Sequence, residues 1–457
     1  MTGLDEHPVS PQIPLTVWAA RRLHALAATE YDDQTRRKVA QCLLDHLGAC
    51  VAALHHRAAP PIGHYLDQRA EGSKSEAVHW GQRSSMRAEE AAFGNSVLGH
   101  ALIRDDMHVA SGTHIGSMVV PAAIALAQRE QWSGRQLVRA LIGGYDMAVR
   151  LGTAIRPGST TAHFRPSGIN GAFGVVAAAI AATDPHEDVA VNALGLAANA
   201  AAGVNEWPWA GGQEVYTHLA SAARNGLVAF DLAVSGFRAS ASALDGRDGM
   251  FAAYGADSNG TATFIAPDSA DPLIRRIKHK PYSGCNLVQT PLAAAIQLHS
   301  SVADRILQID SVTIHTFALA RDYPGCNNTG PFQFVEQSKM SLQFAVSAAL
   351  ARGQVDEDAY RAFADPHIAH LIDRCQILVE PKFTPALARM EQPVSIEIRT
   401  LDGRNYSAEL DDVPWLDENA VIARFRREVG RCCQQLSSKT SSKPRTVSGT
   451  TATALLC

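Results

Sequence analysis

The chain has 457 residues, of which 46% are apolar and 19% charged, and its 41 Lys and Arg against 45 Asp and Glu give a formal net charge of -4. This balance excludes an intrinsically disordered body and predicts a globular protein with more than one domain. Because no basic excess is present to neutralise a phosphate backbone, we expect no nucleic-acid partner.

The first residues of the chain lack the features of an export signal. Asp5 and Glu6 stand where a secretory signal needs a basic start. The most apolar windows, such as residues 118–127, are far shorter than the roughly 20 residues that cross a bilayer. The eight cysteines include no Cys-x-x-Cys pair, which is typical of reduced thiols. We therefore expect a cytoplasmic protein without a membrane partner.

Residues 1–267 are expected to form helix after helix. Apolar residues recur at spacings of three and four, as in the stripe formed by Ala40, Leu44, Leu47, Val51 and Leu54. Ser133 and Gln136 form a capping-box pattern that opens another helix. Residues 177–182 and 218–232 predict two more, and we expect an all-helical domain.

The pattern changes near residue 268. Alternating β-branched residues at 312–316 and 394–398 predict strands, and the Asp402-Gly403 pair predicts a hairpin leading into residues 406–410. A helix over 338–352 ends at Gly353, and residues 417–433 look helical again. We predict a mainly α fold, in which a large all-helical domain (1–267 plus 412–436) carries a smaller inserted α+β domain (268–411).

The last residues, 437–457, are rich in Ser and Thr and contain three basic and no acidic residues. This composition predicts a disordered tail. Three of the chain's positive charges therefore lie in the tail, and the folded body is more acidic than the whole.

Several common catalytic motifs are missing. The sequence contains no G-x-G-x-x-G after a strand, no G-x-x-x-x-G-K-S/T, no H-E-x-x-H and no G-x-S-x-G. Dinucleotide, nucleotide and nucleophile-elbow chemistries are therefore disfavoured.

The most informative stretch runs from His100 to His114 and contains three histidines and two adjacent carboxylates within fifteen residues. Its Gly-Thr-His-x-Gly end is too broken for a helix, so we expect a loop that presents His108 and His114 near a helix N-terminus, where anions bind well. Because histidine titrates near neutral pH, this loop is a candidate for general acid/base catalysis and carboxylate binding.

Two other interpretations of this stretch stay open. Asp105 and Asp106 could cap a helix while the histidines bond to backbone groups. A metal site is the third possibility, although no tight ligand motif is present; its ligands would be Asp105, Asp106, His108 and His114.

Two further segments carry weaker signals for anion binding. His163 and Arg165 precede an alanine-rich helix, and Lys278 and Lys280 lie at the expected domain junction. An ordinary loop and a solvated basic turn are the alternatives for these two segments.

A series of short motifs follows in order along the chain: His100-Ala-Leu with Asp105-Asp106, Ser111-Gly-Thr-His114, Gly143-Gly-Tyr145, Arg150-Leu-Gly, Gly171-Ala-Phe-Gly174, Ala222-Ala-Arg-Asn-Gly226, Leu244-Asp-Gly-Arg-Asp-Gly249, Lys280-Pro-Tyr with Cys285, and Ser338-Lys-Met-Ser-Leu-Gln-Phe344. Together they resemble the MmgE/PrpD family, which includes 2-methylcitrate dehydratase, cis-aconitate decarboxylase and iminodisuccinate epimerase. The resemblance covers residues 15–430. It implies an active site between a helical and an α+β domain, a homodimer, and chemistry that uses neither an organic cofactor nor a metal.

The family's functional residues carry over in part. His114 matches the histidine of the Thr-His motif, and Lys280 matches the lysine before the aromatic residue of the second domain. Four positions depart from the pattern, because the better-known lyases have Asp, Thr, His and Lys at the places of Ile103, Met107, Arg165 and Val215. The family's chemistry is therefore better supported than its known substrates.

We predict an enzyme that abstracts an α-proton from a small di- or tricarboxylate, as a dehydratase-type hydro-lyase. An epimerase or a decarboxylase is the alternative within this chemistry, and a non-catalytic polycarboxylate-binding protein is the alternative outside it. His114 and Lys280 are the expected base and acid in either order, and burial between the domains would supply the lowered pKa that a lysine base needs.

Further residues are assigned supporting roles. Tyr145, His108 and Asp106 are second choices for proton relay or orientation, while Arg165, His163 and Lys278 would bind substrate carboxylates. We expect five residues to converge on one cleft between the domains: Arg165, His163, His114, Lys278 and Lys280.

Overall fold

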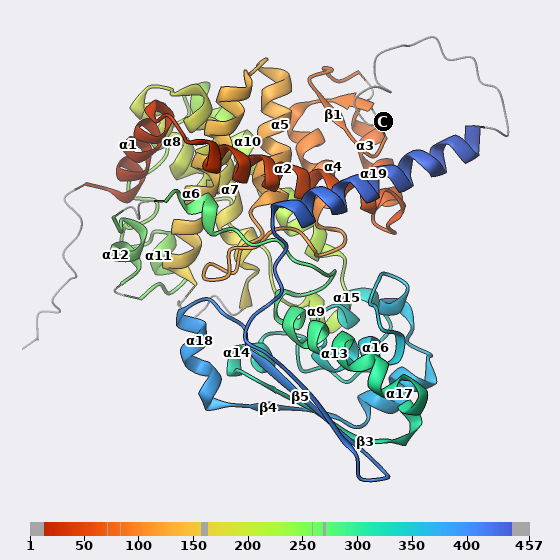
Figure 1. Cartoon of the computed structure of the whole chain (residues 1–457). Coiled ribbons are helices and arrows are strands. Elements are labelled where there is room, and N and C mark those ends of the chain that lie inside the picture. Colours follow the sequence, from red (N-terminus) through yellow and green to blue (C-terminus); the bar gives the residue numbers. More distant parts are fainter. Residues whose placement is uncertain are drawn as a thin grey trace, which may run out of the picture.

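The computed structural model describes residues 13–440 except 71, 83, 157–162, 258 and 268–270, and it describes side chains as far as residue 434. Figure 1 shows a large helical body above a smaller body that contains a sheet. The long helices of the large body are α1 (Leu15–Ala28), α2 (Asp33–Ala52), α3 (Ala59–Ala70), α4 (Ala88–His100), α5 (Gly116–Arg129), α6 (Gly134–Ile155), α7 (Pro166–Thr183), α8 (Glu187–Ala198), α10 (Glu214–Val234) and α19 (Glu418–Thr440). The mainly α fold with a smaller α+β part is thus confirmed.

Helix α7 is the central helix of the large body, between α6 and α10. It approaches α6 closely because a Cβ added at Gly144 would lie 2.9 Å from the carbonyl oxygen of Gly174. By length and composition alone α7 could cross a membrane, but 89% of this stretch is buried inside the protein. It has the character of a core helix.

Local signals placed several helices correctly. Ser133 caps α6 with a complete capping box, in which Gln136 bonds back to the cap backbone. The predicted helix over α2 also exists, but its buried face contains Val39, Cys42 and Ala49, whereas Ala40 is exposed and Leu44 half-buried. The helix was therefore predicted correctly and its inward face was not.

The large body also contains a short hairpin, so the expectation that it is all-helical is wrong in this detail. Strands β1 (Ala77–His79) and β2 (Ser84–Met86) pair antiparallel. Asn95 of α4 fastens this hairpin by accepting a hydrogen bond from Trp80 N and donating one to Val78 O. Strands of three residues are too short to show an alternating pattern in the sequence.

The smaller body is built on a four-stranded sheet. Its strands are β3 (Ile309–Thr316), β4 (Cys375–Val379), β5 (Val394–Thr400) and β6 (Asn405–Leu410), in the spatial order β4-β3-β5-β6. The predicted hairpin is confirmed as the antiparallel pair β5–β6, with Gly403 at φ +83° in its turn. Strand β4, which pairs parallel to β3, was not predicted.

Helices cover one side of this sheet, as Figure 1 shows. They are α13 (Gln289–Val302), α16 (Leu342–Arg352) and α17 (Pro366–Ile372). Helix α16 ends at Gly353 in the left-handed conformation, as expected, but it begins at Leu342 with Ser341 as its cap, because a break separates it from α15 (Val335–Ser338). The shorter helices are α9 (Trp207–Ala210), α11 (Met250–Ala253), α12 (Gly260–Phe264), α14 (Ala318–Asp322) and α18 (Thr384–Ala388).

After the sheet the chain returns to the large body as α19, which packs along α2. Arg424 of α19 is buried, pairs with Asp45 of α2, and donates a 2.7 Å hydrogen bond to the carbonyl of Lys280. The helix reaches Thr440 and so includes the first residues of the predicted tail, and residues 441–457 lie outside the described part of the chain. The return helix thus fixes the junction between the two bodies.

Candidate active site

The stretch after α4 forms the predicted loop and leads directly into α5. Two residues of α7 hold it: the Ser167 hydroxyl accepts a 3.0 Å hydrogen bond from His114 N, and Asn170 donates one of 2.7 Å to the Thr113 hydroxyl. Within the loop, His108 and Thr113 form an antiparallel backbone bridge. The position of His114 is therefore set by the buried start of α7.

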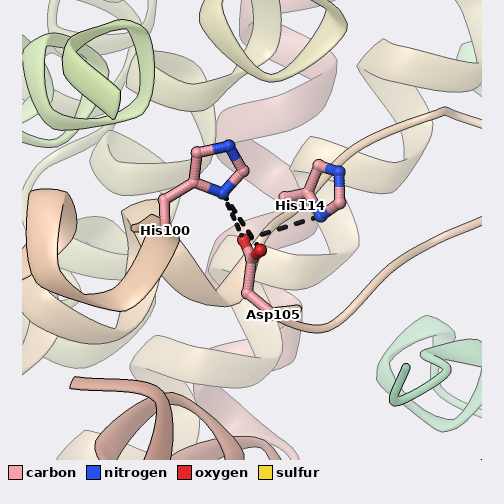
Figure 2. A group of neighbouring side chains, drawn as sticks. All are labelled: His100, Asp105 and His114. Atoms are coloured by element: carbon pink, nitrogen blue, oxygen red, sulfur yellow. Dashed lines mark hydrogen bonds and ion pairs between the residues drawn. The ribbon is translucent and has the colours of Figure 1, made fainter. Parts of the chain in front are cut away.

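His100, Asp105 and His114 form a buried cluster at the centre of this loop (Figure 2). Nδ1 of His100 lies 2.9 Å from the Asp105 carboxylate, Nδ1 of His114 lies 3.5 Å from it, and the Ser117 hydroxyl donates to it at 2.7 Å. Burial opposes ionisation of Asp105, but its interactions with His100, His114 and Lys280 outweigh this and hold its pKa well below the usual range. Asp105 is therefore an ionised carboxylate.

The hydrogen bonds fix the tautomer of His114. Its Nδ1 faces two acceptors, the carbonyl of Asp106 at 3.1 Å and the carboxylate of Asp105, so Nδ1 carries the hydrogen. Figure 2 shows that Nε2 points away from Asp105, and no residue in the described part of the chain bonds to it. Burial lowers the pKa of His114 well below its ordinary value, so the ring is neutral and Nε2 offers a lone pair.

Two cationic side chains join this cluster. Arg165, immediately before α7, donates a 3.2 Å hydrogen bond to Nε2 of His100, lies over the ring of Trp207, and leaves its buried Nε without a partner. Lys280 is fully buried, donates to the carbonyls of Ile103 and Gly284, and acts electrostatically on Asp105. Burial lowers the pKa of Lys280 to about 8, so its ammonium form still predominates at neutral pH.

The turn after α4 connects the two bodies. Three consecutive carbonyls, those of residues 101, 102 and 103, accept hydrogen bonds from Lys339 Nζ, Gly284 N and Lys280 Nζ respectively. Ile103 has φ +52°, which is rare for a β-branched residue and persists where neighbouring contacts enforce it. These bonds set the position of His100 and Asp105 relative to Lys280.

Asp106 and Tyr145 form a buried pair next to the cluster of His100, Asp105 and His114. The Tyr145 hydroxyl donates a 2.5 Å hydrogen bond to Asp106, whose other oxygen accepts one of 2.8 Å from Gly116 N. Burial raises the pKa of Asp106 to about 7, with a contribution from Asp45. The Asp106 and Tyr145 side chains therefore bond to each other and form a pair that can supply a proton. The pair is connected to His114 through the backbone carbonyl of Asp106.

Three of the predicted site residues lie apart from the cluster. His108 is buried, but its ring bonds to Ser111 and lines a different cavity. His163 and Lys278 have exposed side chains, and Lys278 meets the loop through backbone hydrogen bonds with Met107. Of the five residues expected to converge, three lie together: His114, Arg165 and Lys280.

The geometry does not support the metal site considered from the sequence. Asp106 is bonded to Tyr145, and His108 faces another side of the loop, so the four expected ligands are not assembled. His100, Asp105 and His114 do place ligand atoms within 4.8 Å of one another. A divalent cation there would, however, share one buried volume with the positive charges of Arg165 and Lys280, which is electrostatically unfavourable.

A cavity of about 330 Å³ lies beside the cluster, between the two bodies. Phe164 and Pro166, the neighbours of Arg165, line it together with Tyr323, whose phenol acts electrostatically on Arg165. The buried thiols of Cys285 and Cys326 contact each other nearby, and this hydrogen bond lowers the pKa of Cys285 to about 7. The cavity is of the size that small ligands use.

The sequence interpretation missed the roles of two histidines. His100 stands in the informative stretch, five residues before Asp105, and this proximity was the available signal. His218 of α10 is half-buried and interacts electrostatically with Arg165 and His100. It stands alone in a helical sequence pattern, so no motif pointed to it. Val215, at the family's lysine position, is fully buried in the apolar core, so this chain has no cation there.

Comparison with known families agrees with the motifs. The model described as the MmgE/PrpD N-terminal domain matches residues 19–261, and that of the MmgE/PrpD C-terminal domain matches residues 282–415. No curated protein matches the chain significantly. Members of this family are generally enzymes, hydro-lyases among them. With both domain models matched in order over most of its length, the chain belongs to the MmgE/PrpD family.

Proposed function

We propose that this protein is an enzyme that removes a proton from the carbon next to a carboxylate of a small di- or tricarboxylate, in a dehydratase-type lyase reaction without a cofactor. One observation carries the proposal. The closed cluster holds two positive side chains, Arg165 and Lys280, against the single ionised carboxylate of Asp105, while its histidines are neutral. A buried excess of positive charge favours an anionic ligand.

The hydrogen bonds support one direction of proton transfer. His114 is the base, because it is neutral and its Nε2 lone pair is free of other described partners. Lys280 is the proton donor, because it is mostly charged at neutral pH and its pKa of about 8 is close to the working range. Arg165 contributes its unpartnered Nε to a substrate carboxylate.

The reaction would proceed as an elimination. His114 takes the α-proton, the electron pair moves toward the adjacent carboxylate, and Arg165 stabilises the negative charge that develops there. A hydroxyl on the neighbouring carbon then leaves as water with a proton from Lys280. A departing hydroxyl needs an acid to protonate it, and the presence of the charged Lys280 therefore supports a lyase reaction.

One observation favours epimerisation as the second candidate. Two groups that exchange protons near neutral pH, His114 and Lys280, both belong to the cluster, and an epimerase needs two such groups on opposite faces of the substrate. In that reaction Lys280 returns a proton to the carbon, and nothing leaves.

Proton NMR in heavy water tests the proposal. The wild-type protein is incubated with a panel of saturated and hydroxylated di- and tricarboxylates. A new vinyl proton signal with loss of the substrate's signals indicates a dehydratase. Deuterium at the α-carbon with inversion indicates an epimerase, and the proton signals of an acid with one carboxylate fewer indicate a decarboxylase. Binding without any exchange across the panel would contradict catalysis and favour a polycarboxylate-binding protein.

A matched pair of variants ties the activity to the site. His114→Gln removes the base and should lower the exchange rate by roughly 10² to 10⁴. His64→Gln alters an exposed histidine on α3 and should leave the rate unchanged. Full exchange by a folded His114→Gln protein would refute the assignment of the base.

A further inference from the structure

His100 is a buried, titratable residue that takes no part in the proton transfers proposed above. It is the last residue of α4, in which every residue from 91 to 100 is buried, and its own side chain is fully buried. The carbonyl of His100 accepts a 2.9 Å hydrogen bond from Ile103 N, which ties this helix end to the turn that follows. The imidazole is therefore held firmly beside the base and the cations of the candidate site.

The two ring nitrogens of His100 have different partners. Nδ1 lies 2.9 Å and 3.0 Å from the two oxygens of the Asp105 carboxylate (Figure 2), and Nη2 of Arg165 donates to Nε2 at 3.2 Å. A guanidinium can only donate, so Nε2 is the acceptor and Nδ1 carries the hydrogen. A protonated ring would turn an N–H toward the guanidinium. The geometry therefore requires a neutral imidazole that donates to Asp105 and accepts from Arg165.

The bond to Nε2 fixes the orientation of Arg165. The guanidinium also lies over the ring of Trp207, 5.4 Å from its centroid, and its Nε has no hydrogen-bond partner. A cation–π contact fixes how far the charge lies from the ring, but not which N–H groups face the site. A hydrogen bond to one nitrogen does fix this. His100 therefore determines which N–H groups of Arg165 remain for a substrate carboxylate.

The other side of the ring acts on the base. The carboxylate of Asp105 accepts from Nδ1 of His100 and from the Ser117 hydroxyl, and it lies 3.5 Å from Nδ1 of His114. The rings of His100 and His114 also contact each other, with their centroids 5.2 Å apart. Hydrogen bonds to an ionised carboxylate favour its charged form. That charge keeps the hydrogen of His114 on Nδ1 and leaves its Nε2 lone pair available.

We infer that His100 is a positioning residue with two separable functions, one at each ring nitrogen. Nε2 orients Arg165 toward the carboxylate of the substrate, and the Nδ1–H holds an ionised Asp105 beside His114. One neutral ring thus connects the group that binds the substrate to the group that removes its proton. The inference rests on the proposed function, in which Arg165 binds the substrate and His114 is the base.

Asparagine and glutamine at position 100 separate the two functions, because each amide reaches the place of one ring nitrogen. His100→Asn places an N–H donor near Nδ1 and leaves Arg165 without its acceptor. His100→Gln places a carbonyl oxygen near Nε2 and leaves Asp105 without its donor. Each variant is the matched control of the other, because both replace the same buried ring by an amide. His64→Asn, at an exposed histidine on α3, should leave binding and rate unchanged.

Calorimetric titration with succinate measures the first function. His100→Asn should weaken binding about tenfold or more, and His100→Gln should bind as the wild type does. The second function shows in the kinetics of the panel acid that the wild type exchanges fastest. His100→Gln should lower kcat about tenfold or more with KM nearly unchanged, whereas His100→Asn should mainly raise KM. Equal effects of the two variants on both quantities would overturn the inference, because the ring would then act only through packing.

Two NMR measurements on the full-length protein need no ligand. In the wild type, labelled histidine should show a neutral His100 ring with its hydrogen on Nδ1, and a hydrogen on Nε2 would overturn the inference. With labelled arginine, the guanidinium of Arg165 should rotate slowly in the wild type and in His100→Gln and rapidly in His100→Asn. Equal rotation in the two variants would also overturn it. The expected difference in rotation, in a protein that neither binds succinate nor exchanges any acid, would support the positioning of Arg165 and refute the proposed function.

Discussion

The buried carboxyl group of Asp106 predicts how the stability of the protein changes with pH. Its pKa is raised from 3.8 to about 7 in the folded protein. The folded state therefore binds this proton more tightly than the unfolded state, so the contribution of Asp106 to stability falls as the pH rises from about 4 to about 7. From these two pKa values, the contribution at pH 5 exceeds that at pH 8 by roughly 2.5 kcal/mol.

Asp106→Asn removes the titration while keeping the shape and the hydrogen-bonding positions of the side chain. Urea unfolding of the wild type and the variant at pH 5, 6, 7 and 8 gives the difference in unfolding free energy at each pH. That difference should shift by roughly 2.5 kcal/mol in favour of the variant between pH 5 and pH 8. Other titrating groups cancel, because they are common to both proteins.

Tyr145→Phe provides a second arm. The Tyr145 hydroxyl stabilises the ionised form of Asp106, so its loss should move the transition to higher pH. A wild-type to Asp106→Asn difference that stays constant from pH 5 to pH 8 would refute the reasoning, because Asp106 would then be ionised throughout.

Three further substitutions test the site. Lys280→Met should lower the rate of turnover by roughly 10² to 10⁴, and it should abolish the loss of activity that deprotonation causes above about pH 8 in the wild type. Wild-type activity that rises through pH 8 would instead make Lys280 the base. Lys339→Met removes the charge that lies 2.7 Å from Glu357 and leaves that carboxylate only its 3.6 Å contact with His56. Urea unfolding should show a loss of about 2–3 kcal/mol in the free energy of unfolding, and a loss below about 1 kcal/mol would contradict this. Ser167→Ala leaves the buried His114 N–H unpaired and should lower the free energy of unfolding by about 1–3 kcal/mol. The exchange rate should also fall, and an unchanged rate would mean that α7 does not position His114.

Local signals were sufficient to predict much of the fold. The capping box at Ser133, the Asp402-Gly403 turn and the left-handed Gly353 each act over a few residues, and each is present as expected. The change from helical to alternating periodicity also separated the two kinds of body. Strand β4 was missed because its five residues follow a helix without a turn signal of their own.

The candidate site was predicted less completely, since its geometry depends on contacts between distant segments. Spacing could not distinguish His108 from His114, because α7 and the backbone bridge decide which ring meets Asp105. Lys278 and Lys280 were equally cationic in the sequence, yet one is exposed and the other fully buried. The homodimer and the cytoplasmic location stay predictions.

The turn at residues 101–103 has a consequence for how this family member can vary. Three successive carbonyls receive donors from the second body, one from each of Lys339, Gly284 and Lys280. The three hydrogen bonds fix the register of the turn, because inserting or deleting one residue would shift every carbonyl by one peptide relative to its donor. The number of residues in this turn is therefore constrained, because the distance between the proposed acid and base depends on it.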